Sequence, residues 1–292
     1  MDKQRFLNFL KFEKRYSEHT LEAYGLEIDT FLTFLEEENI AFEEVDYRLV
    51  RQYLAMLRDS GRQASSINRT ISSLRSFYKF LVRENLSQRN PMHLVKALKI
   101  PKKLPVVVEE SKMLTLLDKM GETDDFETVR DFLVLELLFG TGIRLAELLA
   151  IQERDIDLYN KKVLIFGKRN KERFVPIHTT LVNTVKRYLH AKYIQDFENK
   201  SAYLIVTKEG KPAYRALIYR IVKKYLSQIT SQDKKSPHVL RHSFATALLN
   251  NGADLNAIKE LLGHAGLAAT QVYTHNSVER LKSIYKQAHP KA

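Results

Sequence analysis

The chain has 292 residues, of which 44% are hydrophobic and none is cysteine, and its formal net charge is +12. This length predicts two packed units, and the hydrophobic fraction excludes a disordered chain, because the apolar surface is large enough to offset the entropy lost on folding. The absence of cysteine excludes disulfides and thiolate metal sites, while the lack of a long apolar run or a signal-like N-terminus predicts a cytoplasmic protein with no membrane partner.

The positive charge predicts a polyanionic partner, because phosphates that are neutralised by Lys and Arg release condensed counterions. A basic but merely solvated surface is the alternative interpretation. Residues 1–50 carry more acidic than basic side chains, whereas residues 51–100 are strongly basic. This uneven distribution favours the polyanionic partner.

Apolar residues at helical spacing predict helices over 20–38, 50–59 and 65–85. The third helix has an apolar face, made of Ile67, Ile71, Leu74, Tyr78 and Leu81. Its basic side chains fall largely away from that face and are candidates for DNA contact, with a solvated helix face as the alternative: Arg69, Arg75, Lys79 and Arg83.

A stretch rich in proline and lysine, 91–106, separates these helices from the rest of the chain. Proline disfavours the helical conformation of the residue before it, so this stretch is expected to be a linker. Its lysines make it basic enough to lie against DNA, with Lys102 and Lys103 as the candidate contacts. The sequence therefore divides into a helical unit 1–90, a basic linker 91–106 and a second unit 107–292.

In the second unit, helices are expected over 109–119, over 127–139 and again from about residue 179. The only convincing strand signal is a hairpin, formed by 162–166 and 173–177 around a polar turn. Pro176 should place the second strand at an edge or bring it to its end, because proline has no N–H to donate. Residues 154–158 are a candidate third strand.

The first cluster of functional candidates follows the second of these helices. Two glycines in Gly140-Thr-Gly142 allow a tight turn, which places Arg144 in the first turn of a new helix, near exposed backbone N–H groups. An anion could bind there. A surface salt bridge between Arg144 and Glu147 is an equally good interpretation.

A second cluster lies in Ser236-Pro237-His238-Val-Leu-Arg241. Serine at the N-cap and proline at the first helical position predict a helix start, so His238 and Arg241 share a face near the positive end of the helix dipole. His238 and His242 also have the spacing of zinc ligands on a helix. The residue after His238 is not the glutamate that the metalloprotease pattern requires, which disfavours zinc.

A third cluster comes near the end of the chain. His264 follows Leu-Gly at the end of a short helix that Asp254 caps, and Tyr273 comes nine positions later. A tyrosine by itself is usually a packing residue. Only the combination with the other clusters is specific.

Six residues in this order and spacing resemble the active site of the tyrosine recombinase (phage integrase) family: Arg144, Lys168, His238, Arg241, His264 and Tyr273. The helical first hundred residues are similar to the core-binding domain of that family. The ending, Tyr285-Lys-Gln-Ala-His289-Pro, looks like the C-terminus of its XerC/XerD-like subgroup. Ala146 and Ala265 depart from the serine that is common in relatives, but neither is one of the six.

The resemblance implies a mainly α fold. An N-terminal all-helical core-binding (SAM-like) domain, 1–90, is followed by a mostly helical catalytic domain, 107–292, with a small antiparallel sheet. Double-stranded DNA is the implied partner, bound by a tetramer on two DNA sites. A sister Xer recombinase and an activating DNA translocase of the FtsK type are further candidate partners, and the implied localisation is nucleoid-associated.

The resemblance also implies a role for each site residue. Tyr273 is the nucleophile that attacks a DNA phosphate, leaving a 3′-phosphotyrosyl link and a free 5′-hydroxyl. Arg144 and Arg241 clamp the phosphate, and His264 donates to a non-bridging oxygen. His238 is the candidate base, and Lys168 is the general acid. Lys171 is the nearest decoy for Lys168. The implied chemistry needs no metal, ATP or other cofactor, and the sequence has no Walker-type glycine-rich loop.

The C-terminal segment and the biological role each leave alternatives open. Val278, Leu281, Ile284 and Tyr285 form an amphipathic stripe, which either packs on its own domain or, as in the family, docks on a neighbouring protomer. The leading function is resolution of chromosome dimers at a dif-like site before cell division. The alternatives are the integrase of a phage or mobile element and, from another class, a non-cutting DNA-binding or architectural protein.

Overall fold

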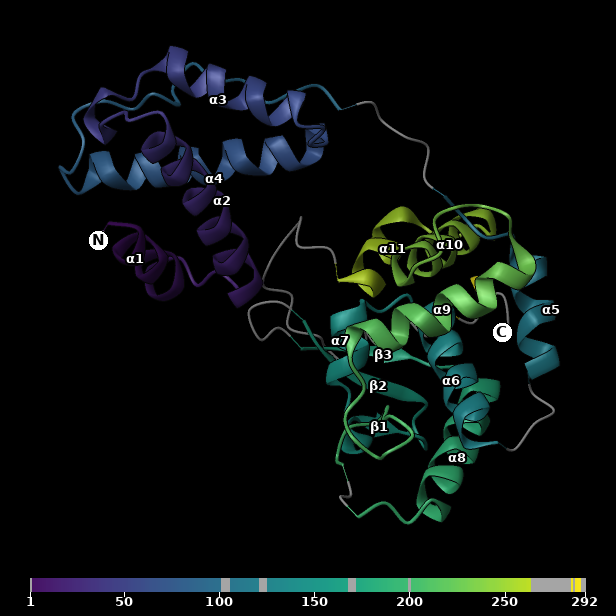
Figure 1. Ribbon diagram of the computed structural model, residues 1–292. Helices are drawn as coiled ribbons and strands as arrows, with labels where there is room; N and C mark the ends of the chain where they lie inside the picture. Colours follow the sequence, from purple (N-terminus) through teal and green to yellow (C-terminus); the bar gives the residue numbers. More distant parts are fainter. Residues whose placement is uncertain are drawn as a thin grey trace. The chain divides into compact units, whose positions relative to one another are not determined.

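The computed structural model describes residues 2–100, 106–120, 125–167, 172–198, 201–263, 285 and 287–289. The chain divides into two compact units, Met1–Lys103 and Leu104–Ala292 (Figure 1). The described part of the first contains helices and no strand, and the second combines helices with a small antiparallel sheet, which confirms the expected fold class. No helix in the described residues is long and apolar enough to cross a membrane.

The first unit is a helical bundle. Its elements in chain order are α1 (Asp2–Asn8), the π-helix η1 (Phe9–Glu13), α2 (Glu18–Glu37), the 3₁₀ helix η2 (Phe42–Glu44), α3 (Tyr47–Asp59) and α4 (Ala64–Arg83). Helix α3 begins three residues before the expected start because Asp46 caps it, accepting a hydrogen bond of 2.8 Å from the Leu49 backbone. The expected apolar face of α4 is buried, and α4 packs against α1, α2 and α3.

The second unit is organised around one buried helix. Its helices are α5 (Glu110–Met120), α6 (Phe126–Thr141), α7 (Leu145–Ala150), α8 (Thr179–Ile194), α9 (Arg215–Ile229), α10 (Pro237–Asn250) and α11 (Leu255–Leu262). Every residue of 129–141 in α6 is buried, and α6 contacts α5, α7, α8, α9 and α10. A helix that is apolar on all sides is expected to be covered on all sides.

The sheet has the strand order β1-β2-β3, with β1 (Ile156–Asp157), β2 (Lys162–Phe166) and β3 (Glu172–Pro176) all antiparallel. The hairpin is as expected, and Pro176 is the last residue of an edge strand. The first strand is shorter than the expected 154–158, because Glu153–Asp155 form the 3₁₀ helix η3, stabilised by a 2.8 Å hydrogen bond from the Gln152 backbone to the Asp155 carboxylate.

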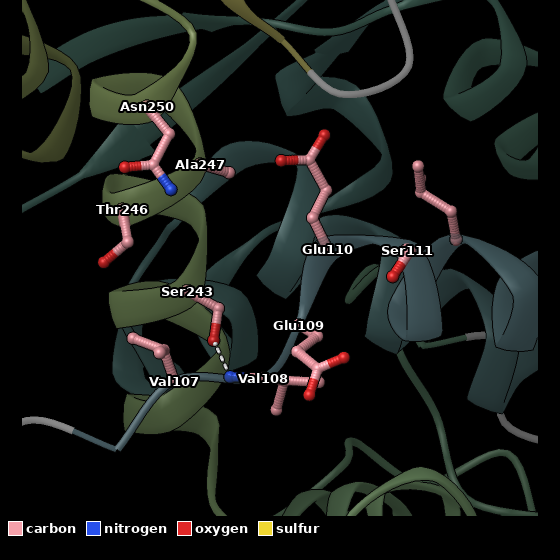
Figure 2. Close-up of a pocket in the computed structure, with 10 residues that line it drawn as sticks. Val107, Val108, Glu109, Glu110, Ser111, Ser243, Thr246, Ala247 and Asn250 are labelled. Carbon is pink, nitrogen blue, oxygen red and sulfur yellow. Dashed lines mark hydrogen bonds between the residues drawn. The ribbon is translucent and has the colours of Figure 1, made fainter.

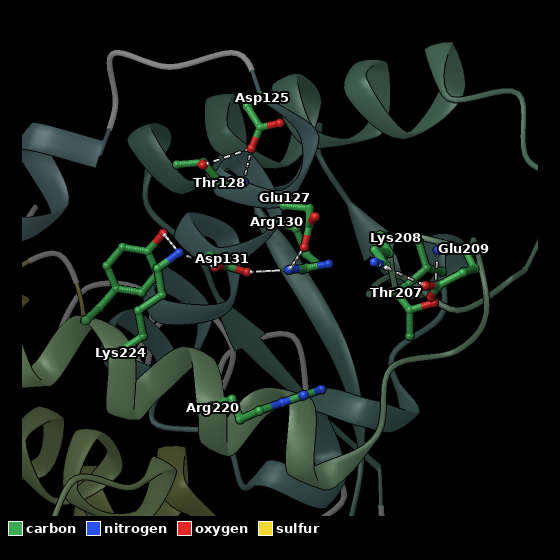
Figure 3. A network of polar contacts seen from close by, with 12 residues as sticks. Asp125, Glu127, Thr128, Arg130, Asp131, Thr207, Lys208, Glu209, Arg220 and Lys224 are labelled. Atoms are coloured by element: carbon green, nitrogen blue, oxygen red, sulfur yellow. Dashed lines mark hydrogen bonds and ion pairs between the residues drawn. The ribbon is translucent and has the colours of Figure 1, made fainter.

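A polar network on α6 connects it with α9 (Figure 3). The guanidinium of Arg130 donates to the carboxylates of Asp131, at 2.8 Å, and Glu127, at 3.2 Å, and Lys224 of α9 lies 3.7 Å from Asp131. Burial raises the pKa of Asp131 above its usual value, although Arg130 acts in the opposite direction. Arg130 and Asp131 are both buried, and neither belongs to the sequence clusters described above.

The chain enters the second unit as an extended segment that crosses α10 before α5 begins. The Val108 backbone donates to the Ser243 hydroxyl of α10 at 2.8 Å, as Figure 2 shows. Residues on both sides of this crossing, including Glu110 and Asn250, line a shallow surface pocket.

Of the expected C-terminal stripe, only Tyr285 lies within the described residues, and Val278, Leu281 and Ile284 lie outside them. Tyr285 and Ala288 are buried in a small apolar cluster that includes Phe244 of α10. The Tyr285 hydroxyl donates to the Gly140 carbonyl at 2.7 Å, and the Asn251 side chain donates to the Ala288 carbonyl at 3.0 Å.

Gly142 ends α6 in the left-handed conformation, with φ of 61°, and its N–H donates to the Leu138 carbonyl at 3.1 Å. A Cβ at this position would lie 2.3 Å from Cδ1 of the buried Phe244 and 2.8 Å from Cδ2 of Leu262. Both the backbone conformation and the close approach of these side chains therefore require glycine here.

We predict that Gly142→Ala lowers the free energy of unfolding by about 2–5 kcal/mol, because left-handed strain of about 1–2 kcal/mol adds to an overpacking cost of about 1–3 kcal/mol. Gly252→Ala is the matched control, since Gly252 has φ of 84° but nothing within 4 Å of a Cβ. Gly252→Ala should lose only the about 1–2 kcal/mol that comes from left-handed strain. Urea denaturation of both variants would contradict this account if the two losses were equal.

Candidate active site

Arg144 is the N-cap residue of α7, directly after the Gly142 turn. Its backbone N–H donates to Oε2 of Glu147 and its Nη1 donates to Oε1, both at 2.8 Å. The pair considered from the sequence is therefore formed. It is not a surface pair, however, because the Glu147 side chain is only 4% exposed, against 31% for Arg144.

Arg173 of β3 is the second partner of Glu147, and sequence reasoning missed it. Its Nη1 and Nη2 donate to Oε1 and Oε2 at 3.0 and 2.9 Å, a two-pronged contact that is stronger than a single neutral hydrogen bond. Strand alternation was the available signal: Arg173 lies on the same buried face as Val175, so an inward-pointing guanidinium requires a buried acceptor.

The protonation state of Glu147 follows from two opposed effects. Burial raises the pKa of the carboxyl, but the hydrogen bonds and charge of Arg173 and the hydrogen bonds from Arg144 outweigh it. The pKa of Glu147 therefore lies below its ordinary value, and the group is a carboxylate at neutral pH.

Arg241 of α10 faces the same region. Its Nη1 donates to the Gly142 carbonyl and its Nη2 donates to the Leu262 carbonyl at 2.7 Å. Burial, together with the positive charges of Arg144 and Arg173, lowers the pKa of Arg241 to about 10, whereas Glu147 opposes this shift. The guanidinium remains protonated at neutral pH.

The three arginines bind three consecutive carbonyl oxygens at the C-terminal end of α11. Arg173 Nε donates to Leu261 at 3.1 Å, Arg241 Nη2 donates to Leu262, and Arg144 Nη2 donates to Gly263 at 2.9 Å, in that order along the chain. The last carbonyls of a helix lack intrahelical partners and form the negative end of its dipole, so cations stabilise them. We name Arg144, Glu147, Arg173 and Arg241 the arginine cluster; three positive charges and one negative charge make it net positive.

The remaining expected site residues are placed differently. Helix α10 begins as predicted, with Ser236 at the N-cap and Pro237 as the first helical residue, and His238 is exposed one turn before Arg241. Lys168, His264 and Tyr273 lie outside the described residues. Within the described ranges, no group of three His, Cys, Asp or Glu side chains could hold a metal ion.

The candidate DNA contacts of the first unit are exposed, but three of them also have partners within the protein. Arg69 binds Glu27, Arg75 donates to the Val95 carbonyl at 2.6 Å, and Arg83 pairs with Glu13 and Glu84. Lys79 is exposed on the same helix. Lys102 and Lys103 lie outside the described residues.

Glu27 of α2 is a buried carboxylate, with a side chain 2% exposed, that holds two surface arginines. It accepts hydrogen bonds from Arg69 at 2.7 and 3.0 Å, from Arg62 at 3.2 Å and from the Thr70 hydroxyl at 2.6 Å. Arg62 was not among the sequence candidates. Two guanidinium groups around one carboxylate leave this part of the surface net positive.

Comparisons with known proteins cover both units. The family model for the phage integrase family matches residues 107–280, and that for the phage integrase N-terminal SAM-like domain matches residues 4–85. The chain is 40% identical to the tyrosine recombinase XerC of Listeria innocua, over 99% of this chain and 97% of the relative. It is 37% identical to the tyrosine recombinase XerD of Staphylococcus saprophyticus, over 99% and 98% respectively.

A solved structure has the same fold. The crystal structure of the XerH site-specific recombinase bound to a palindromic difH substrate superposes with a TM-score of 0.74, at 21% identity, over 96% of this chain and 83% of that chain.

We predict that Glu147→Gln lowers the free energy of unfolding by about 3–5 kcal/mol at neutral pH, because it leaves the buried Arg173 without its counter-ion. Glu109→Gln is the control: Glu109 is 67% exposed and pairs with Lys112 at the surface, so its loss should cost less than about 1 kcal/mol. Urea denaturation of both variants measures the difference.

The stabilising effect of Glu147 should depend on pH. Because its folded-state pKa is lowered, its contribution is complete above the ordinary pKa of a glutamate and is lost as the pH falls through the lowered value. The stability difference between wild type and Glu147→Gln should therefore shrink in acid. A difference that grows as the pH falls would show that the carboxylate is not stabilised by its arginines.

Proposed function

Because the chain belongs to the phage integrase family of tyrosine recombinases, and is therefore a site-specific DNA recombinase, we propose that it resolves chromosome dimers by recombination at a dif-like site. Its similarity to proteins named XerC and XerD extends over nearly the whole chain, and the related XerH structure holds a difH substrate. Family membership favours this function over that of a non-cutting DNA-binding protein.

The arginine cluster is the structural observation that carries the DNA-cleavage chemistry of this proposal. Phosphoryl transfer is accelerated mainly by positioning and by stabilising the charge that builds on the phosphate oxygens. Arg144 and Arg241 are partly buried in a group that is net positive, and a guanidinium has five N–H donors. Among the described residues, their contacts engage Nη1 and Nη2 of each, so donors remain for the scissile phosphate.

The covalent step uses Tyr273. An unperturbed tyrosine has a pKa of about 10 and is almost entirely protonated at neutral pH, so His238 accepts its proton as the phenolic oxygen attacks the phosphorus. The bond to the 5′ oxygen breaks, and Lys168 supplies the proton that this oxygen gains. His264 donates to a non-bridging oxygen. The 5′-hydroxyl of a second strand reverses the step, so the reaction needs neither metal nor ATP.

The first unit and the linker supply DNA contacts in this proposal. The side chains that contact the phosphate backbone are those of Arg69, Arg75, Lys79 and Arg83, with Arg62 beside them, and of Lys102 and Lys103 in the linker. The buried Glu27 supports the role of Arg62 and Arg69, because it holds both guanidinium groups in defined positions at the surface. The active assembly is a tetramer on two DNA sites. A sister Xer recombinase and a translocase of the FtsK type are its proposed partners.

We predict that wild-type protein incubated with a nicked suicide duplex carrying a dif-like site forms a covalent protein–DNA complex without added metal or ATP, and that Tyr273→Phe forms none. A denaturing gel detects the complex. Retarded DNA on a native gel with no covalent product from wild type on any site would instead support DNA binding without cleavage.

Lys79→Ala should weaken binding to DNA of any sequence and reduce the slope of log affinity against log salt by about 1, the value for one lost phosphate contact. Lys3→Ala is the matched control, because Lys3 lies on α1, outside the proposed DNA contacts, and its ammonium is paired with Asp29 at 2.6 Å. Its slope should equal that of wild type. Equal slopes for all three proteins, from fluorescence anisotropy titrations, would remove Lys79 from the DNA surface.

A further inference from the structure

Glu147 presents a problem of charge at the proposed site. It is a buried anion in direct contact with Arg144, and a carboxylate 2.8 Å from a guanidinium cancels much of the charge that a phosphate would use. Arg173 adds a second cation on the same carboxylate, with one hydrogen bond to each oxygen. The charged groups that face Glu147 in the described residues are thus Arg144, Arg173 and Arg241.

We propose that Arg173 is a positioning residue for DNA cleavage: as the dedicated counter-ion of Glu147, it keeps the charge of Arg144 and Arg241 available to the scissile phosphate. This inference rests on the proposed recombinase function. Arg173 itself is only 6% exposed and reaches the reaction through Glu147, so it is not a catalytic residue.

A second contact extends this role to α11. Arg173 Nε donates to the Leu261 carbonyl, and a Cβ on Gly263 would lie 3.1–3.3 Å from three atoms of the guanidinium. The backbone of Gly263 therefore lies against Arg173. His264 directly follows Gly263 in the sequence, so Arg173 positions the last residue before that histidine.

A purely structural role is the competing explanation, and Arg130 represents it. Arg130 is also a buried arginine, 3% exposed, and its partner Asp131 is a buried carboxylate. Its network joins α6 with α9 and includes none of the arginine cluster (Figure 3). A structural role predicts that Arg173→Met and Arg130→Met behave alike. The counter-ion role predicts a different result for Arg173→Met alone: its cleavage rate should depend on whether Glu147 is charged, whereas the rate of Arg130→Met should not.

The experiment measures the rate of covalent complex formation on a nicked suicide duplex at saturating DNA, from pH 6 to pH 9, for full-length proteins shown to be folded by circular dichroism. We expect Arg173→Met to form the complex about 10- to 100-fold more slowly than wild type at neutral pH. Loss of a donor that touches the reacting oxygen typically costs more, about 10²- to 10³-fold. The affinity of Arg173→Met for DNA should stay close to that of wild type. Arg173→Lys, which keeps the charge, should recover much of the rate.

The pH profile separates the two explanations. Without Arg173, burial is opposed only by Arg144, so the pKa of Glu147 is higher than in wild type. A larger fraction of the carboxyl is then neutral as the pH falls, and this fraction no longer cancels the charge of Arg144. The rate of Arg173→Met relative to wild type should therefore rise towards low pH. The double variant Glu147→Gln/Arg173→Met removes both charges and should be faster than Arg173→Met, with a relative rate independent of pH.

Three results would overturn the proposal: a double variant no faster than Arg173→Met, a relative rate for Arg173→Met that is flat with pH, or the same loss and pH response in Arg130→Met. A wild-type protein that forms no covalent complex would refute the recombinase function and this inference together. A wild-type protein that cleaves while Arg173→Met cleaves equally fast would refute the role of Arg173 alone.

Discussion

The second unit depends on one buried carboxylate. Glu147 accepts hydrogen bonds from the N-cap of its own helix and from Arg173 on the edge strand, while Arg144 and Arg173 also reach the end of α11. Three elements that are far apart in the sequence are therefore held by a single ionised group. Removing one partner would leave a buried charge without compensation, so each member of the cluster depends on the others for its stability.

Both units use acidic residues to arrange a basic surface. In each, one buried carboxylate, Glu27 or Glu147, binds more than one arginine, and the group as a whole remains positive. Arginine suits this arrangement because its planar fork can bind a carboxylate on one edge and still present N–H donors on another. The net charge of +12 does not describe how the charges are arranged, because some of the acidic side chains determine where the basic side chains lie.

Sequence patterns predicted the local structure well where they depend on neighbours in the chain. Periodicity located the main helices to within three residues, and Ser236-Pro237 and Asp254 marked helix starts. The family resemblance found by six separated residues agrees with the comparisons. Contacts between distant segments were harder to predict: Arg173 was overlooked, and the binding of Arg69 to Glu27 depends on how α2 and α4 pack, which periodicity does not encode.

The turn at the end of α6 connects the C-terminal residues with the arginine cluster. The Gly140 carbonyl accepts a hydrogen bond from Tyr285, and the Gly142 carbonyl, two residues later, accepts one from Arg241. Residues 129–141 of α6 are buried and Gly142 has no room for a side chain, so the surrounding residues closely constrain the path of this turn. A single turn therefore fixes both Tyr285 and the guanidinium of Arg241, through carbonyl groups that are two residues apart.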